Sequence, residues 1–127
     1  MILVDTSAWI DFFRDRGRIA DAVDTALESG EAALCGPVLT EIRRGLRAPQ
    51  RRRVLPLLDG CHLLRQPEDL WLSAGDLGAV LARRGVTIKT LDLLIAVYAI
   101  AHGAPLLTTD GDFRSIARAG VGLSLAD

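Results

Sequence analysis

Short apolar segments alternate with longer amphipathic ones along this chain, and that alternation restricts the fold more than any other feature. The strand-like segments are residues 2–5, 32–35, 61–64, 105–109 and 121–125. Helical spacing or capping residues mark the segments that follow 2–5 and the ranges 18–29, 36–45, about 50–58, 67–85, 91–102 and 112–118. Apolar strands that alternate with helices predict a parallel sheet covered on both faces. We therefore expect an α/β three-layer sandwich with a central, mostly parallel sheet of four to five strands flanked by helices.

The composition bounds the class of protein. A chain of 127 residues, half of them hydrophobic, suits one folded domain over 1–127. The formal net charge of -1 means that any binding of nucleic acid depends on a local patch. The two cysteines, Cys35 and Cys61, indicate reduced core thiols in a cytosolic protein, although a bridge between them is possible.

Nothing in the sequence indicates export or insertion into a membrane. No basic segment precedes a long apolar one at the N-terminus, so a signal peptide is not expected. The longest apolar run, 93–101, is much shorter than the roughly 20 residues that span a bilayer. We expect a soluble, cytoplasmic protein without a membrane partner.

Four acidic residues lie in or beside strongly apolar sequence: Asp5, Glu41, Asp92 and Asp110. A carboxylate at the edge of a core is unfavourable unless its charge is compensated. No cluster of histidine or cysteine accompanies these acids, so the compensating ion is expected to be a hard, oxygen-binding cation such as Mg²⁺ or Mn²⁺. The pattern predicts metal-dependent chemistry on phosphate.

The expected topology brings these acids toward one place. Asp5 and Asp110 each follow an apolar strand, at the sheet edge where α/β proteins bind ligands. Asp92 falls in the first turn of its helix, where the dipole favours negative charge, and Glu41 can reach the same crevice from within a helix. Asp112 is a fifth candidate. One or two bound ions would orient a water and lower its pKa.

Each acid also has a purely structural interpretation. A strand-end acid can be the N-cap of the next helix, although Thr6 and Ser7 are good N-caps for the first one. Asp92 suits the first turn of any helix, and Glu41 could form a surface salt bridge with an arginine. Asp112 could cap the helix that begins there. Joint placement of all four acids by accident is much less favoured than any one of these.

The sequence resembles a known family at four ordered motifs. They are Ile-Leu-Val-Asp-Thr-Ser at 2–7, Leu-Thr-Glu-Ile at 39–42 with Gly45, Asp-Leu-Leu-Ile-Ala at 92–96, and Leu-Thr-Thr-Asp-Gly-Asp-Phe at 107–113. Together they are similar to the PIN-domain ribonucleases and, within them, to the VapC toxins of bacterial and archaeal toxin–antitoxin pairs. The match is colinear over essentially the whole chain.

This resemblance implies a PIN-like fold and a Mg²⁺- or Mn²⁺-dependent endoribonuclease that uses metal-activated water. It implies a catalytic quartet of Asp5, Glu41, Asp92 and Asp110, and metal ligands from Asp5, Asp92, Asp110 and Asp112. It further implies a homodimer, neutralisation by a VapB-type antitoxin, and cleavage of structured RNA such as transfer or ribosomal RNA.

Basic residues beside the acids are candidates for contact with RNA. Six arginines follow Glu41: Arg43, Arg44, Arg47, Arg51, Arg52 and Arg53. We expect Arg43 and Arg44 to contact phosphates, and Lys89, just before Asp92, is a further candidate. The arginines could instead form an ordinary charged helix face or dock an acidic partner segment, and Lys89 could be solvated.

The aromatic residues are expected to have structural roles. Trp9, Phe12 and Phe13 suit the core or a groove for the antitoxin, and Trp71 suits the core. Two other functions are considered. A catalytically inactive PIN-like binding module that acts through its partner protein fits the same sequence. An aspartyl-phosphate phosphotransferase fits poorly, because it requires a second aspartate where Ser7 stands.

Overall fold

The computed structural model describes residues 1–126 and contains a parallel four-stranded sheet. The strands lie in the order β3-β2-β1-β4, and each neighbouring pair is parallel. They are β1 (Ile2–Val4), β2 (Ala32–Leu34), β3 (His62–Leu63) and β4 (Leu106–Leu107). The chain moves outward from β1 through β2 to β3 and then returns to the other side of β1. The strand order therefore reverses between β1 and β4, which is where an open α/β sheet forms its ligand crevice.

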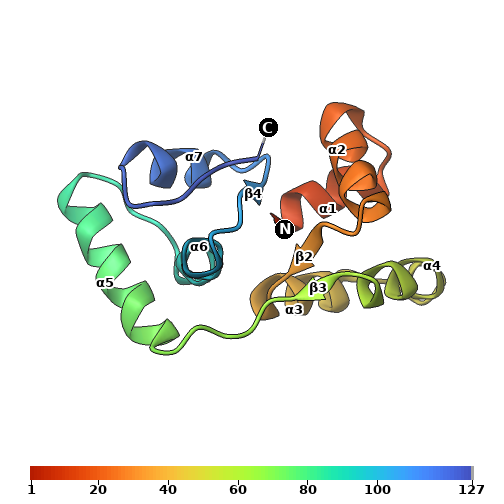
Figure 1. The fold of residues 1–127 in the computed structure, drawn as a ribbon, viewed down its shortest axis with the longest axis horizontal. Helices are drawn as coiled ribbons and strands as arrows, with labels where there is room; N and C mark the ends of the chain where they lie inside the picture. Colours follow the sequence, from red (N-terminus) through yellow and green to blue (C-terminus); the bar gives the residue numbers. More distant parts are fainter. Residues whose placement is uncertain (127) are drawn as a thin grey trace.

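Seven helices connect and cover these strands. They are α1 (Thr6–Phe13), α2 (Gly17–Glu28), α3 (Gly36–Gly45), α4 (Ala48–Asp59), α5 (Leu70–Arg83), α6 (Thr90–His102) and α7 (Gly111–Arg118). Figure 1 shows α1 and α2 on one side of the strands and α5 and α6 on the other. The expected α/β fold, with helices on both faces of a parallel sheet, is confirmed.

The centre of the core is formed by β1 and α6. Leu3 and Val4 are fully buried in β1, and α6 is buried continuously from Asp92 to Ala99. A helix that is apolar on every side must be enclosed by other elements, and this explains the uninterrupted apolar run that follows Asp92. The helix carries that aspartate to the edge of the interior. Within residues 1–126, no helix has the length and apolar character needed to cross a bilayer.

The C-terminal segment adds less to the sheet than the sequence suggests. The region 121–125 was expected to be a strand, but it forms an isolated parallel bridge between Leu106 and Leu125. Two backbone hydrogen bonds hold it, from the Leu106 N–H to Ser124 and from the Ala126 N–H to Leu106. A single bridge covers the edge of β4 without a fifth full strand.

Two expectations for α5 are wrong. The helix begins at Leu70 instead of Pro67, because Asp69 adopts a left-handed conformation with φ of 56° immediately before it. Trp71 was expected in the core but is 65% exposed. The buried side of α5 carries Leu70, Ala74 and Leu81, and a residue directly after Leu70 is rotated by about 100° from that side.

Candidate active site

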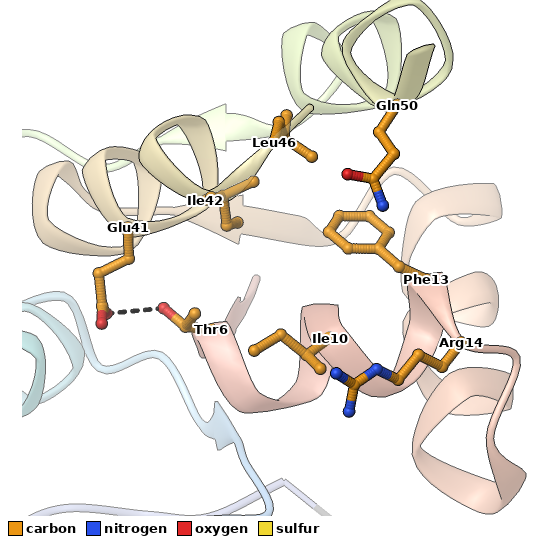
Figure 2. Close-up of a pocket in the computed structure, with 9 residues that line it drawn as sticks. Thr6, Ile10, Phe13, Arg14, Glu41, Ile42, Leu46 and Gln50 are labelled. Carbon is orange, nitrogen blue, oxygen red and sulfur yellow. Dashed lines mark hydrogen bonds between the residues drawn. The ribbon is translucent and has the colours of Figure 1, made fainter. Parts of the chain in front are cut away.

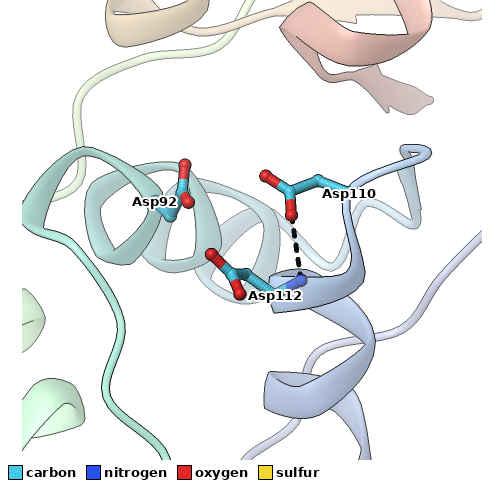
Figure 3. Close-up of side chains that lie close together, drawn as sticks. All are labelled: Asp92, Asp110 and Asp112. Carbon is cyan, nitrogen blue, oxygen red and sulfur yellow. Dashed lines mark hydrogen bonds between the residues drawn. The ribbon is translucent and has the colours of Figure 1, made fainter.

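Three carboxylates from α6 and α7 meet at the crevice between β1 and β4. One oxygen each of Asp92, Asp110 and Asp112 lies within 4.8 Å of the other two. Figure 3 shows the three carboxylates close together. Asp92 is buried at 4% exposure, whereas Asp112 is exposed. We call these residues the acid trio. Three negative charges at this spacing repel one another unless a cation or a proton joins them.

The start of α7 orients two members of the acid trio. Asp110 is the N-cap, and its Oδ1 accepts a hydrogen bond of 2.9 Å from the Asp112 N–H. Asp112 was considered as the cap of this helix, and that interpretation is wrong. Its carboxylate is not used in capping and faces Asp92 instead (Figure 3).

Asp92 has a buried oxygen without a hydrogen-bond donor. No residue of the described part of the chain donates to its Oδ2, and the Lys89 Nζ lies 3.6 Å away, too far for a hydrogen bond. Burial raises the pKa of Asp92 to about 6, opposed by Lys89 and reinforced by repulsion from Asp110, Asp5 and Asp112. A carboxylate with a buried oxygen that has no hydrogen-bond donor, grouped with two further carboxylates, matches the all-oxygen ligand set of Mg²⁺ or Mn²⁺.

Asp5 is held from the other side of the crevice by hydroxyl groups. It is 4% exposed, and its Oδ2 accepts hydrogen bonds from the Ser7 Oγ at 2.7 Å and the Thr108 Oγ1 at 2.9 Å. Asp5 is the N-cap of α1, so the expectation that Thr6 or Ser7 would cap this helix is wrong. No residue of 1–126 donates to the Asp5 Oδ1, which leaves that oxygen for a ligand.

Thr108 connects the ends of β1 and β4. Its Oγ1 donates to Asp5 and also accepts a hydrogen bond of 3.0 Å from the Asp110 N–H. The Ser7 Oγ similarly donates to Asp5 and accepts from the Thr109 N–H at 3.0 Å. Each hydroxyl therefore fixes an acid and a backbone position together. No role was expected for Thr108 from the sequence, although a hydroxyl residue at the end of an apolar strand, two positions before Asp110, was the available signal.

Glu41 is anchored separately, on α3. One of its oxygens accepts a hydrogen bond of 2.8 Å from the Thr6 Oγ1, drawn in Figure 2. Glu41 was considered as a partner of an arginine, but within residues 1–126 the ion pair found is Lys89–Asp92. The carboxylate lies at one end of a pocket of about 300 Å³ between α1 and α3, lined further along by Ile10 and Phe13 (Figure 2).

Two further groups of residues named from the sequence are the aromatic residues of α1 and the arginines of α3. Trp9 is fully buried, and its ring lies 5.9 Å from that of Phe12 and 5.8 Å from that of Phe13. The structural role expected for this group agrees with that arrangement. Arg43 and Arg44 are exposed on α3, so both guanidinium groups are accessible to a ligand.

Comparisons with known proteins agree with this geometry. The sequence model of the PIN domain matches residues 2–119. Ribonuclease VapC11 of Mycobacterium tuberculosis is 37% identical over 124 residues, which cover 93% of this chain and 92% of the relative. The chain belongs to the VapC ribonucleases of the PIN domain family. Ribonuclease VapC21 of the same species is 31% identical over 101 residues, 75% of this chain and 72% of that one.

Solved structures support the same assignment of the fold. VapBC-1 from nontypeable Haemophilus influenzae matches with a TM-score of 0.75 and 26% identity, covering all of this chain and 98% of that one. A DNA-bound VapBC from Salmonella typhimurium also gives a TM-score of 0.75, at 21% identity, over 100% of this chain and 98% of that one, and shows the likeness of fold alone.

In this PIN domain the two cysteines do not provide a nucleophile. Both are free thiols, as expected. Burial raises the pKa of Cys35 to about 12 and that of Cys61 to about 11, so neither carries a thiolate near neutral pH. Neither thiol is therefore a nucleophile for a phosphodiester near neutral pH.

Proposed function

We propose that this chain is the toxin of a type II toxin–antitoxin pair and cleaves RNA by metal-dependent hydrolysis. The catalytic residues are Asp5, Glu41, Asp92 and Asp110. Asp5, Asp92, Asp110 and Asp112 hold Mg²⁺ or Mn²⁺. Two observations carry the proposal: one oxygen from each carboxylate of the acid trio lies within 4.8 Å of the other two, and the buried Oδ2 of Asp92 has no hydrogen-bond donor within residues 1–126.

The bound ion would lower the pKa of a water and offset charge that develops on the phosphodiester. The residues of the chain position the reactants around it. Asp92, Asp110 and Asp112 bind from one side of the crevice, and Asp5 offers its Oδ1 from the other. Glu41 remains outside the acid trio, with Thr6 holding one oxygen. Its second oxygen orients the attacking water and accepts its proton.

The expected partners follow from the relatives. VapBC-1 from H. influenzae and a protein from Klebsiella pneumoniae described as a toxin–antitoxin complex have similar folds, the second with 25% identity and a TM-score of 0.68 over 89% of this chain and 90% of that one. By analogy, a VapB-type antitoxin neutralises this chain, which acts as a homodimer on structured RNA such as transfer or ribosomal RNA. Arg43, Arg44 and Lys89 contact that RNA.

The test compares the wild-type protein with Asp92→Asn on total RNA, with Mg²⁺ or EDTA. Removing a metal ligand should lower the rate by about 1,000-fold, equivalent to about 4 kcal/mol of transition-state stabilisation. Asp24→Asn, an exposed carboxylate on α2, is the matched control and should cleave normally. Cleavage that persists in Asp92→Asn or in EDTA would refute the metal-dependent mechanism. If the wild type does not cleave but still binds its antitoxin, the chain is the inactive binding module instead.

A further inference from the structure

A basic pocket lies where the end of α5 meets the end of α7. Its volume is about 290 Å³, and it is lined by Arg84, Val86, Ser115, Arg118 and Ala119. Figure 1 shows the segment after α5 beside the C-terminal end of α7. The guanidinium of Arg84 donates a hydrogen bond to the Ala119 carbonyl and so fixes the two elements together. None of the lining residues is acidic.

The two arginines have unused donors. Within residues 1–126, neither Arg84 nor Arg118 forms an ion pair, and the Arg118 guanidinium has no hydrogen-bond acceptor from the protein. Each guanidinium offers five N–H donors. Within residues 1–126, the hydrogen bond to Ala119 is the one that Arg84 donates, and the Arg118 guanidinium donates none. Arg118 lies in the last turn of α7, where the helix dipole stabilises a cation. The Ser115 hydroxyl donates to the Gly111 carbonyl, so the free donors of the pocket are those of the two exposed guanidinium groups, which match a phosphate group.

Two segments of the chain lead from the pocket to the acid trio. Along α7, Arg118 follows Asp112 by six residues, which is about 9 Å along the helix axis and about 120° around it. Along the chain after α5, Arg84 precedes Lys89 by five residues, and Lys89 pairs with Asp92. A nucleic-acid strand whose scissile phosphate lies at the acid trio could therefore place a neighbouring phosphate at this pocket.

We propose that Arg84 and Arg118 form a second phosphate site that holds the RNA backbone beside the scissile bond. This inference rests on the proposed function, since the ligand is the RNA substrate. The acid trio repels a polyanion, and the whole chain has a formal net charge of -1, so attraction must come from local cations. Lys89 shares its charge with Asp92, and the two arginines of the pocket add cations that form no ion pair within residues 1–126.

Binding is measured first, in an Asp92→Asn background that does not consume the RNA. Fluorescence anisotropy with a labelled single-stranded RNA compares Arg118→Gln and the double variant Arg84→Gln/Arg118→Gln with their parent. Loss of two phosphate contacts should weaken binding about tenfold and reduce the slope of log K against log salt by about 1.4. The pair Arg16→Gln/Arg18→Gln, near the start of α2 on the other side of the sheet, is the charge-matched control.

Two further comparisons separate phosphate contact from a fold defect. Arg118→Lys keeps the charge and should retain most of the affinity. Arg118→Gln replaces an exposed guanidinium that has no hydrogen bond or ion pair within residues 1–126, so a loss of binding there does not reflect a broken contact inside the protein. An affinity and salt slope equal to those of the parent, or equal losses in the Arg16/Arg18 control, would overturn the proposal.

Steady-state cleavage by otherwise wild-type protein gives the second readout. In the double variant, KM should rise about tenfold while kcat is unchanged, because the chemical step occurs at the acid trio. A lower kcat with an unchanged KM would contradict the second phosphate site. If the wild-type protein cleaves no RNA, the proposed function fails, and the anisotropy experiment still decides whether the pocket binds phosphate.

Discussion

On the β1 side of the crevice, Asp5 and Glu41 accept hydrogen bonds from hydroxyl groups, whereas on the α6–α7 side the carboxylate of Asp92 faces two other carboxylates. Asp5 accepts hydrogen bonds from the hydroxyl groups of Ser7 and Thr108, and Glu41 accepts one from the hydroxyl group of Thr6. Asp92 has a buried oxygen that receives no donor, and Lys89 remains 3.6 Å away. We call the first pair the anchored acids. The unanchored side is Asp92 within the acid trio, because Asp110 itself accepts a hydrogen bond from the Asp112 N–H.

The proposed metal site has two requirements, a fixed position of its ligands and a driving force for binding an ion, and the two sides of the crevice differ in which one they meet. Hydroxyl donors fix the direction of a carboxylate and leave its charge intact, so the anchored acids keep their positions with or without a cation. The acid trio has no such donors on its buried oxygen, and its repulsion is relieved only by a cation or a proton. In the proposed metal site, one side would therefore supply preorganised geometry, and the other would supply most of the driving force for binding an ion.

Among the variants that test this comparison, Thr108→Val is expected to cause the largest loss of Mg²⁺ affinity and of RNA cleavage. This change removes the donor to Asp5 and the acceptor of the Asp110 N–H while preserving the shape of the side chain. Loss of a residue that orients metal ligands typically lowers metal affinity or activity by about 10- to 100-fold. We expect that range for Mg²⁺ binding, measured by calorimetry, and for cleavage of RNA.

Thr108→Ser is the matched control, because it keeps the hydroxyl and should restore most of both values. The same restoration would not be expected if Thr108 acted only by filling space, since serine is smaller. Equal affinities for the valine variant and the wild type would show that the anchored acids do not need this hydroxyl.

The sequence predicted the fold well because apolar runs and helical spacing are local signals. The strands 2–5, 32–35, 61–64 and 105–109 are all present, although each is shorter than expected. The segment 121–125 could not be distinguished from a strand, since its pattern is apolar but its pairing depends on the edge left by β4. Trp71 was misplaced because its exposure depends on where α5 begins, and a left-handed Asp69 sets that start.

The site was predicted only in part, for a related reason. A strand-end position predicts where a carboxylate lies, and this placed Asp5 and Asp110 at the same sheet edge. The partners of each carboxylate depend on side chains from distant elements. Thr108 reaches Asp5 across 103 positions of the chain, and no periodicity or motif spacing encodes that contact. The approach of Asp112 to Asp92 similarly depends on how α7 lies against α6.

A smaller effect is expected from pH, and it applies to the unanchored side. Asp92 has its pKa raised from 3.8 to about 6, mainly by burial. In the metal-free protein it therefore binds a proton more tightly than in the unfolded chain. Its contribution to stability is present at low pH and is lost as pH rises through about 6. Mg²⁺ competes with that proton, so affinity should fall about tenfold between pH 7.5 and pH 5, and about fivefold of that fall should occur below pH 6.

Calorimetric titration of Mg²⁺ between pH 7.5 and pH 5 measures this dependence. Thr108→Ser should follow the wild-type profile, since it leaves Asp92 unchanged. An affinity that is constant across this interval would show that Asp92 is ionised throughout and that its burial does not couple proton and metal binding.

The smallest effect tests the helix pair that carries the unanchored side. Gly78 of α5 lies against α6, and a Cβ at this position would come 2.9 Å from the Cδ1 of Leu93, the residue after Asp92. Gly78→Ala should therefore displace α6 slightly and destabilise the fold by about 1 kcal/mol. Gly75→Ala in the same helix meets no atom within 4 Å and should instead stabilise by about 0.5–1 kcal/mol through helix propensity. Urea denaturation measures both changes.

The same two variants show whether the packing of α5 against α6 affects the site. If Gly78→Ala also weakens Mg²⁺ binding, the position of α6 controls the acid trio. Equal stabilisation by both alanines would show that the Leu93 side chain moves aside and that the close approach of the two helices does not set the site.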